Sequence, residues 1–232
     1  MRVKIYGGAL SSASDLAVLA GANAAALHHA DGAWEVIQFT EAELIGERTY
    51  RLSNLLRGQA GSEWAMTPLL AAGAPFVLLD GHAVTIASGI DARDRTMQLR
   101  VVAAGRDTAD ATALALGVTP GNTAVKPLAP VHLRATRGDA GVTLRWIRRT
   151  RTEGDSWSGE VPLGEDSEAY EVFIMSGAAV VRTLTSMTPT VFYAAADELA
   201  DFGAVQTILT VRVAQLSGTV GRGFAAQAVL RV

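Results

Sequence analysis

Short segments of alternating apolar and polar residues, separated by turn signals, are the main pattern in this chain. In the first half they lie at residues 3–6, 34–39, 49–52, 75–82, 83–86 and 97–103. Successive side chains of a β-strand point to opposite faces, so a period of two predicts half-buried strands at these places. In the segment at 34–39, Glu35, Ile37 and Phe39 share one face.

The sequence predicts little helix in the same half. A capping Ser-Asp pair indicates one short helix at residues 16–19, and residues 22–30 and 105–122 are expected to be loops. Gly58 and Gly61 predict a tight loop that needs left-handed backbone. Several strands with so little helix favour a small β-barrel or β-sandwich.

The second half begins after a Pro-Leu-Ala-Pro linker at residues 127–130, because proline favours an extended conformation in the residue before it. Alternation then predicts a sandwich with strands at residues 131–135, 141–151, 170–174, 180–184, 190–193, 207–215 and 224–232. Trp146 is expected in its core, and residues 195–202 should form a corner built around Leu199. This half resembles a fibronectin type III domain, with Leu209 where that family usually has a tyrosine.

The predicted fold class is therefore all-β, with two domains. Residues 1–127 should form a β-rich barrel or sandwich, and residues 128–232 a fibronectin type III-like sandwich.

Composition narrows the possible functions. The chain has 232 residues, of which 49% are hydrophobic and 19% charged, so it can bury a substantial core. Its net charge of −3 gives no general attraction to nucleic acid. Without cysteine it cannot form disulfides or thiolate metal sites. The start lacks the pattern of a signal peptide, and no apolar run is long enough for a transmembrane segment, so we expect a soluble protein.

The candidate chemical groups do not assemble into a catalytic set. His28 and His29 lack a third ligand at a recognised spacing, which favours exposed loop histidines over a metal site. The loop around Arg57 lacks the ending of a phosphate-binding motif, so its arginine is expected to tie down loop carbonyls or Glu63. No carboxylate pair has the flanking aromatics of a sugar subsite, and no nucleophile motif occurs. The sequence predicts no enzyme, no metal and no cofactor.

An arginine cluster offers two interpretations. Arg148, Arg149 and Arg151 could bind phosphate, nucleic acid or an acidic protein surface, with Asp155 nearby and Trp157 as a stacking platform. Alternatively they form ion pairs with the acidic residues at 153–171, which nearly cancel their charge; this structural interpretation is favoured. Together with Trp64, these five residues are the candidate interface or ligand contacts.

Three segments resemble one family: residues 21–63, which contain LLRGQAGSE, residues 72–80, AGAPFVLLD, and residues 130–170, which contain WIRRTRTEGDSW. They resemble the C-terminal region of the large tail-tip ("megatron", host-specificity) protein of gene transfer agents and related siphophage tails. The resemblance covers nearly the whole chain. In that family the full-length protein carries hub and glycosidase-like domains upstream, so a chain that starts at Met1 is expected to be a C-terminal fragment or a split gene product.

The resemblance implies a structural virion module at the tail tip or baseplate, assembled in the bacterial cytoplasm. Its implied partners are other tail or baseplate subunits, a homotrimer in the full-length context, and a tail fibre or cell-surface glycan. No nucleic acid is implied. Two hypotheses follow. An assembly module should have apolar patches that close only in an oligomer, whereas a carbohydrate- or receptor-binding adhesin should expose a tryptophan such as Trp64 or Trp157 beside polar groups.

Overall fold

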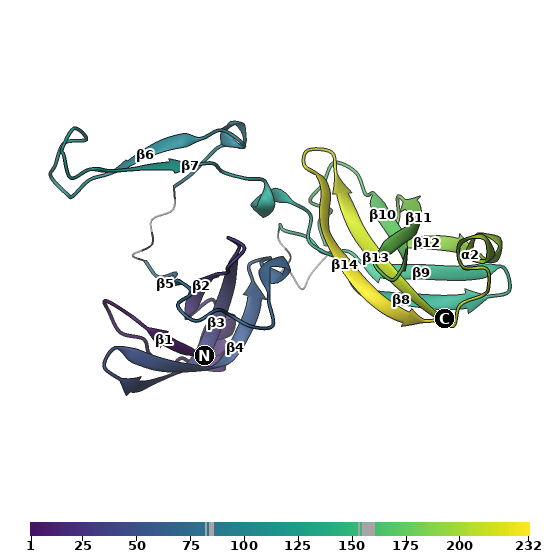
Figure 1. The fold of residues 1–232 in the computed structure, drawn as a ribbon, viewed down its shortest axis with the longest axis horizontal. Coiled ribbons are helices and arrows are strands. Elements are labelled where there is room, and N and C mark those ends of the chain that lie inside the picture. The colour runs from purple at the N-terminus through teal and green to yellow at the C-terminus, as the bar shows by residue number, and fades with distance from the viewer. Residues whose placement is uncertain (82, 84–85, 153, 155–160) are drawn as a thin grey trace. The chain divides into compact units, whose positions relative to one another are not determined.

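A computed structural model describes residues 1–81, 83, 86–152, 154 and 161–232 of the chain. The described residues are almost entirely β-structure, which confirms the predicted all-β class (Figure 1). The chain divides into two compact units, Met1–Ala87 and Ser88–Val232. The predicted domain boundary at residue 127 is not tested by this division and stays a prediction.

The first unit is built on one antiparallel sheet of five strands. In spatial order they are β1 (Arg2–Lys4), β4 (Thr49–Gln59), β3 (Trp34–Gly46), β2 (Ala24–His28) and β5 (Phe76–Leu78). The sheet curls around a core that contains Ile37 and Phe39, which are fully buried (Figure 1). Residue 82, at the end of the predicted strand at 75–82, and residues 84 and 85 of the predicted return strand at 83–86 lie outside the described residues.

Two local predictions for this unit fare differently. The short helix α1 (Asp15–Leu19) is present, and the Ser14 hydroxyl accepts a hydrogen bond from the Ala17 amide at 3.3 Å. The loop expected at residues 22–30 is wrong, because β2 occupies Ala24–His28. Its alanines are weak strand formers, but β2 pairs with both β3 and β5, and this tertiary pairing outweighs local preference.

A separate hairpin forms the first part of the second unit. It consists of β6 (Met97–Val101) and β7 (Leu114–Val118), and short 3-10 helices lie at Ile90–Ala92 and Thr123–Val125. The expected loop at 105–122 is therefore wrong in its second half. Leu114, Leu116 and Val118 alternate with small residues, and pairing with β6 makes a strand of them.

The rest of this unit is a β-sandwich. One sheet has the order β12 (Thr190–Ala194), β9 (Gly141–Ile147), β8 (Val131–Gly138). The other has the order β11 (Ala179–Ser186), β10 (Tyr170–Ser176), β13 (Ile208–Ser217), β14 (Gly221–Arg231). The three-on-four arrangement is that of the predicted fibronectin type III-like sandwich, and Figure 1 shows its two layers. Trp146 lies in the core as predicted, packed edge-on against Tyr170 with ring centroids 5.0 Å apart.

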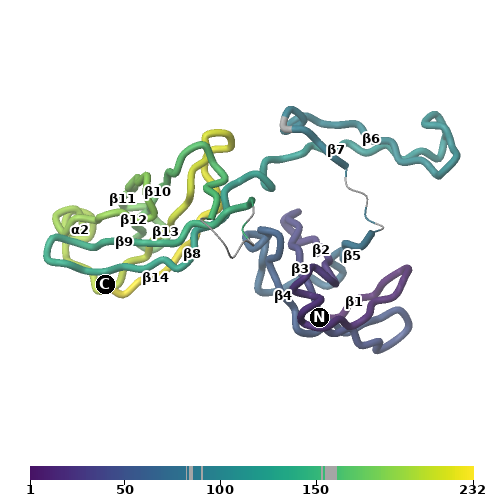
Figure 2. Tube along the Cα trace, turned by 180° about the vertical axis from the view of Figure 1, so that it is seen from behind, coloured from purple at the N-terminus to yellow at the C-terminus, as the bar shows by residue number. Residues whose placement is uncertain are grey.

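The corner after β12 is a helix, α2 (Ala195–Phe202), seen beside β12 at one end of the sandwich in both views (Figures 1 and 2). It is not built around Leu199, which is 52% exposed. The residue turned inward is Glu198, which is fully buried and bonded through both oxygens to Arg137 of β8, at 3.0 and 2.8 Å. The long side chain of Arg137 reaches from β8 to α2 and holds the carboxylate of Glu198. The helix is therefore anchored by Glu198 and not by Leu199.

Candidate functional site

The arginines of the predicted cluster follow β9. This strand was expected to extend to residue 151 but ends at Ile147. Arg148 donates to the carbonyl oxygens of Val161 and Pro162, at 2.5 and 2.7 Å. Arg151 donates to the carboxylate of Glu165 at 2.5 Å. Arg151 thus pairs with an acidic residue of the segment at 153–171, whereas the hydrogen bonds of Arg148 go to backbone carbonyl oxygens.

A tyrosine and a carboxylate extend this arrangement. The Tyr170 hydroxyl donates to Glu168 at 2.7 Å, and Arg148 Nε lies 3.8 Å from the same carboxylate. Burial, followed by the neighbouring carboxylate of Glu168, raises the pKa of Tyr170, so the phenol keeps its proton and acts as a donor. The set ties the segment at 161–168 to the sandwich.

Of the other candidate residues, the structure describes Arg149 and Trp64. Arg149 is half-buried, and Asp155 and Trp157 lie outside the described residues. Trp64 belongs to the first unit, in the 3-10 helix Glu63–Ala65, and is 42% exposed. A second exposed indole, Trp34, lies against His28 across the β2–β3 pair, with ring centroids 4.6 Å apart and the rings tilted by 44°.

A buried polar cluster in the first unit was not predicted from the sequence. Glu35 is fully buried and accepts four hydrogen bonds. They come from Arg57 Nε at 2.9 Å, Arg57 Nη2 at 2.6 Å, the Gly58 amide at 3.1 Å and His29 Nε2 at 3.0 Å. Arg57 Nη1 also donates to the Thr67 carbonyl at 2.9 Å. The cluster clamps the loop after β4 onto β3.

Electrostatics makes this clamp an ion pair. Burial alone would raise the pKa of Glu35, but the hydrogen bonds from Arg57, Gly58 and His29 and the charge of Arg57 outweigh it and hold that pKa below its usual range. The same hydrogen bonds to Glu35 raise the pKa of Arg57. A carboxylate whose oxygens already accept four hydrogen bonds is suited to anchoring the loop.

The expectation that His28 and His29 are exposed loop residues is wrong for His29. It is only 4% exposed, and its Nδ1 lies 3.0 Å from the Thr67 hydroxyl. Arg57 does bind a loop carbonyl, as expected, but its carboxylate partner is Glu35. One signal was available: alternation places Glu35 on the same face as Ile37 and Phe39, and a carboxylate on a buried face requires cationic and hydrogen-bonding partners.

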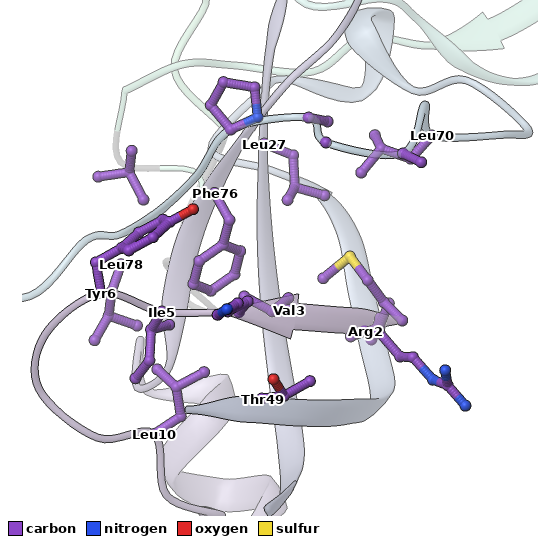
Figure 3. Close-up of a pocket in the computed structure, with 18 of the residues that line it drawn as sticks. Arg2, Val3, Ile5, Tyr6, Leu10, Leu27, Thr49, Leu70, Phe76 and Leu78 are labelled. Atoms are coloured by element: carbon purple, nitrogen blue, oxygen red, sulfur yellow. The ribbon is translucent and has the colours of Figure 1, made fainter. Parts of the chain in front are cut away.

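An apolar groove of the first unit lies between the two edge strands of its sheet. It has a volume of about 1260 Å³ and lies between β1 and β5. Figure 3 shows Val3, Ile5, Leu27, Phe76 and Leu78 among the side chains that line it. No polar set converges on it that resembles a catalytic constellation among the described lining residues.

The β6–β7 hairpin presents a second apolar surface. Its three directly opposed pairs on one face are Met97 with Val118, Leu99 with Leu116, and Val101 with Leu114. Val101 and Leu114 are 54% and 56% exposed. The opposite face carries Gln98, Arg100, Ala115 and Gly117. We call the six-residue side the hairpin apolar face.

No helix among the described residues is long and apolar enough to cross a membrane. No group of three or more His, Asp or Glu side chains there is arranged to hold a metal ion.

Comparisons with known proteins give a partial match. Residues 1–77, about a third of the chain, match the family described as Rcc01698-like, C-terminal. No curated protein matches. Among solved structures, the Clostridium perfringens spore cortex lytic enzyme SleM is 14% identical with a TM-score of 0.30, covering 46% of this chain and 29% of that one. The rat CD45 extracellular region, domains d3–d4, is 10% identical with a TM-score of 0.33, covering 72% and 78%. Neither structural likeness supports an argument.

Proposed function

We propose that this chain is a non-catalytic assembly module of a phage-like tail tip, of the gene transfer agent type, which works by protein–protein contact in the virion. The hairpin apolar face carries the proposal. The resemblance of three segments to the tail-tip protein supports it, and the family match over residues 1–77 covers the first of those segments and most of the second.

The hairpin apolar face needs a covering partner. A two-stranded hairpin alone in water is marginally stable, and this one has only five residues in each strand. Its apolar side chains lie on one side of the two strands, where water would contact them. Exposed apolar patches of this kind mark interaction surfaces.

A second copy of the chain fits this face well. Two flat apolar sheet faces pack against each other about 10 Å apart, with their side chains interdigitated. The six residues carry no charge, so joining two copies requires no charged group to lose water. Other tail or baseplate subunits with an apolar sheet face are the remaining partners of this proposal.

Self-association tests the proposal directly. We expect the light-scattering mass to rise above 24.3 kDa as the concentration of the intact chain increases. Leu116→Glu places a charge in the hairpin apolar face and should hold the chain at its monomer mass. Gln98→Glu adds the same charge on the opposite face of the hairpin and should associate like the unmodified chain. A monomer mass at every concentration, or equal association of both variants, would contradict self-assembly through this face.

A second candidate function is attachment to a cell-surface glycan, which the exposure of Trp64 and Trp34 favours. Flat exposed indoles beside polar side chains are suited to contact sugar rings, and Trp34 has the imidazole of His28 beside it. A glycan array probed with the intact chain tests this idea. Binding that Trp64→Ala or Trp34→Ala abolishes would support it, and an array without any bound glycan would remove it.

A further inference from the structure

The sheet of the first unit has two free edges that run in the same direction. Each neighbouring pair in the order β1-β4-β3-β2-β5 is antiparallel, so strand direction reverses four times between β1 and β5. Within the described residues neither β1 nor β5 pairs with a further strand. A single strand placed between them could therefore be antiparallel to both.

The backbone of β1 offers hydrogen-bonding groups at its free edge. Met1 exchanges hydrogen bonds with Leu52, and the Ile5 amide donates to the Arg48 carbonyl at 2.9 Å. Bonding alternates along an antiparallel strand. The backbone N–H and C=O groups of Met1, Val3 and Ile5 therefore point to β4. Those of Arg2 and Lys4 point to the free edge.

The same alternation applies to β5. The Pro75 carbonyl accepts from the His28 amide at 3.0 Å, and the Leu79 amide donates to the Ala24 carbonyl at 2.8 Å. The backbone groups of Phe76 and Leu78 therefore point away from β2, to the other free edge. Each edge thus presents two residues whose backbone groups are available to a new strand.

The groove between these edges is shaped for an extended apolar segment. Its lining includes the apolar side chains of Val3, Ile5, Leu27, Phe76 and Leu78 (Figure 3). Its volume of about 1260 Å³ exceeds the roughly 300–1,000 Å³ that is usual for small-molecule sites. A strand inserted here would bury alternate side chains in the groove and pair its backbone with both edges.

The positive charge of β1 predicts which residues alternate with the apolar ones in the inserted strand. The side chains of β1 that point away from the groove are Arg2 and Lys4, both exposed, and Arg2 lies directly opposite Arg51 of β4. Side chains on neighbouring strands come within about 5 Å of each other, so acidic residues beside this edge would offset its positive charge.

We propose that this groove binds an extended β-strand of another polypeptide, with apolar residues at alternate positions and acidic residues between them. The strand runs antiparallel to β1 and β5 and closes the five-stranded sheet into a six-stranded barrel. This inference goes beyond the proposed function and does not involve the hairpin, so failure of one leaves the other unchanged.

The test uses the intact chain and a fluorescein-labelled peptide, Glu-Val-Glu-Val-Glu-Val-Glu, in fluorescence anisotropy at peptide concentrations up to about 1 mM. We expect saturable binding, with amide NMR shifts at Lys4, Phe76 and Leu78. The same peptide methylated on its valine nitrogens loses the hydrogen bonds to one edge and should bind at least about tenfold more weakly. Absence of binding, or equal binding of the methylated peptide, would overturn the proposal.

A charge reversal provides the matched control. Lys4→Glu should weaken binding of the glutamate peptide about tenfold and favour the corresponding peptide with lysine in place of glutamate. Arg231→Glu makes the same change of charge on an exposed side chain of the other unit and should leave both affinities unchanged. Equal effects of the two substitutions, or no effect of Lys4→Glu, would mean that β1 does not contact the peptide.

Discussion

Buried carboxylates clasped by arginine side chains fix the irregular segments of both units. In the first unit Glu35 and Arg57 attach the loop after β4 to β3. In the second, Glu198 and Arg137 attach α2 to β8, and the Gln206 amide also donates to Glu198 at 2.8 Å. A planar guanidinium matches both oxygens of a carboxylate, so each pair sets position and orientation together.

Replacing the buried carboxylate in the first unit should be costly. Glu35→Gln removes the charge that Arg57 and His29 face, and we expect a loss of about 3 kcal/mol in the free energy of unfolding. Glu43→Gln is the matched control, because Glu43 lies on the same strand and its pair with Arg51 is exposed to water; it should cost less than about 1 kcal/mol. Amide hydrogen exchange in the first unit, measured in increasing urea, gives both values. Equal costs would contradict the anchoring role.

Acid should weaken the same clamp. The pKa of Glu35 is lowered in the folded chain, so its contribution to stability is complete above the unfolded value of about 4.3 and is lost as pH falls through the lower folded-state value. Between about pH 5 and pH 3, the first unit should lose more stability in Glu43→Gln than in Glu35→Gln. Denaturant unfolding at a series of pH values measures this difference, and parallel pH profiles would refute it.

At this scale the sequence predicts which residues are buried better than it predicts their partners. Alternation placed Glu35 beside Ile37 and Phe39, yet nothing local indicated that Arg57 and His29 would meet it. These contacts join residues that β-sheet pairing brings together. The partners of the arginines after residue 147 are easier to predict, because the acidic residues that pair with Arg148 and Arg151 follow closely in sequence.

Among the elements, the end of β4 contains a glycine that is required for two separate reasons. Gly58 has φ +62°, as the predicted left-handed loop demands, and Gly61 has φ +76°. A Cβ on Gly58 would also lie 2.9 Å from the Glu63 Cα and 2.7 Å from Met66 Sδ. The position therefore excludes side chains by space as well as by backbone conformation.

These two effects can be separated by substitution. Gly8 has φ +70° and open space around its Cβ position, so Gly8→Ala should cost about 1 kcal/mol from backbone strain alone. Gly58→Ala should cost a further 1–3 kcal/mol, approximately, because the loop must move away from β4. Urea unfolding of the first unit compares them, and equal losses would show that the close approach carries no energetic weight.

Element prediction succeeded where alternation was strong and failed where small residues diluted it. The strand starting at Trp34 and most sandwich strands are close to their expected places. The sequence predicts loops at the alanine-rich β2 and at β7. Both become strands through pairing with partners that the local sequence does not identify. The closed or open state of the first unit was likewise not predictable, since it depends on whether the distant edges β1 and β5 meet.

At the scale of the whole molecule, two apolar surfaces have no covering partner among the described residues. The first unit has a groove between two free strand edges, and the hairpin has an apolar face in contact with water. Both features belong to a chain whose described residues form no catalytic constellation. An assembly module accounts for them, because partner subunits would cover the exposed apolar groups.

Hydrogen exchange of the hairpin amides tests this account most directly. The amides of β6 and β7 should exchange rapidly in dilute solution, where a lone hairpin opens easily, and become protected as the chain concentration rises. Amides of the sandwich core strand β10 serve as the internal reference and should not change. Concentration-dependent protection confined to the hairpin would support assembly through its apolar face, and rapid exchange at every concentration would contradict it.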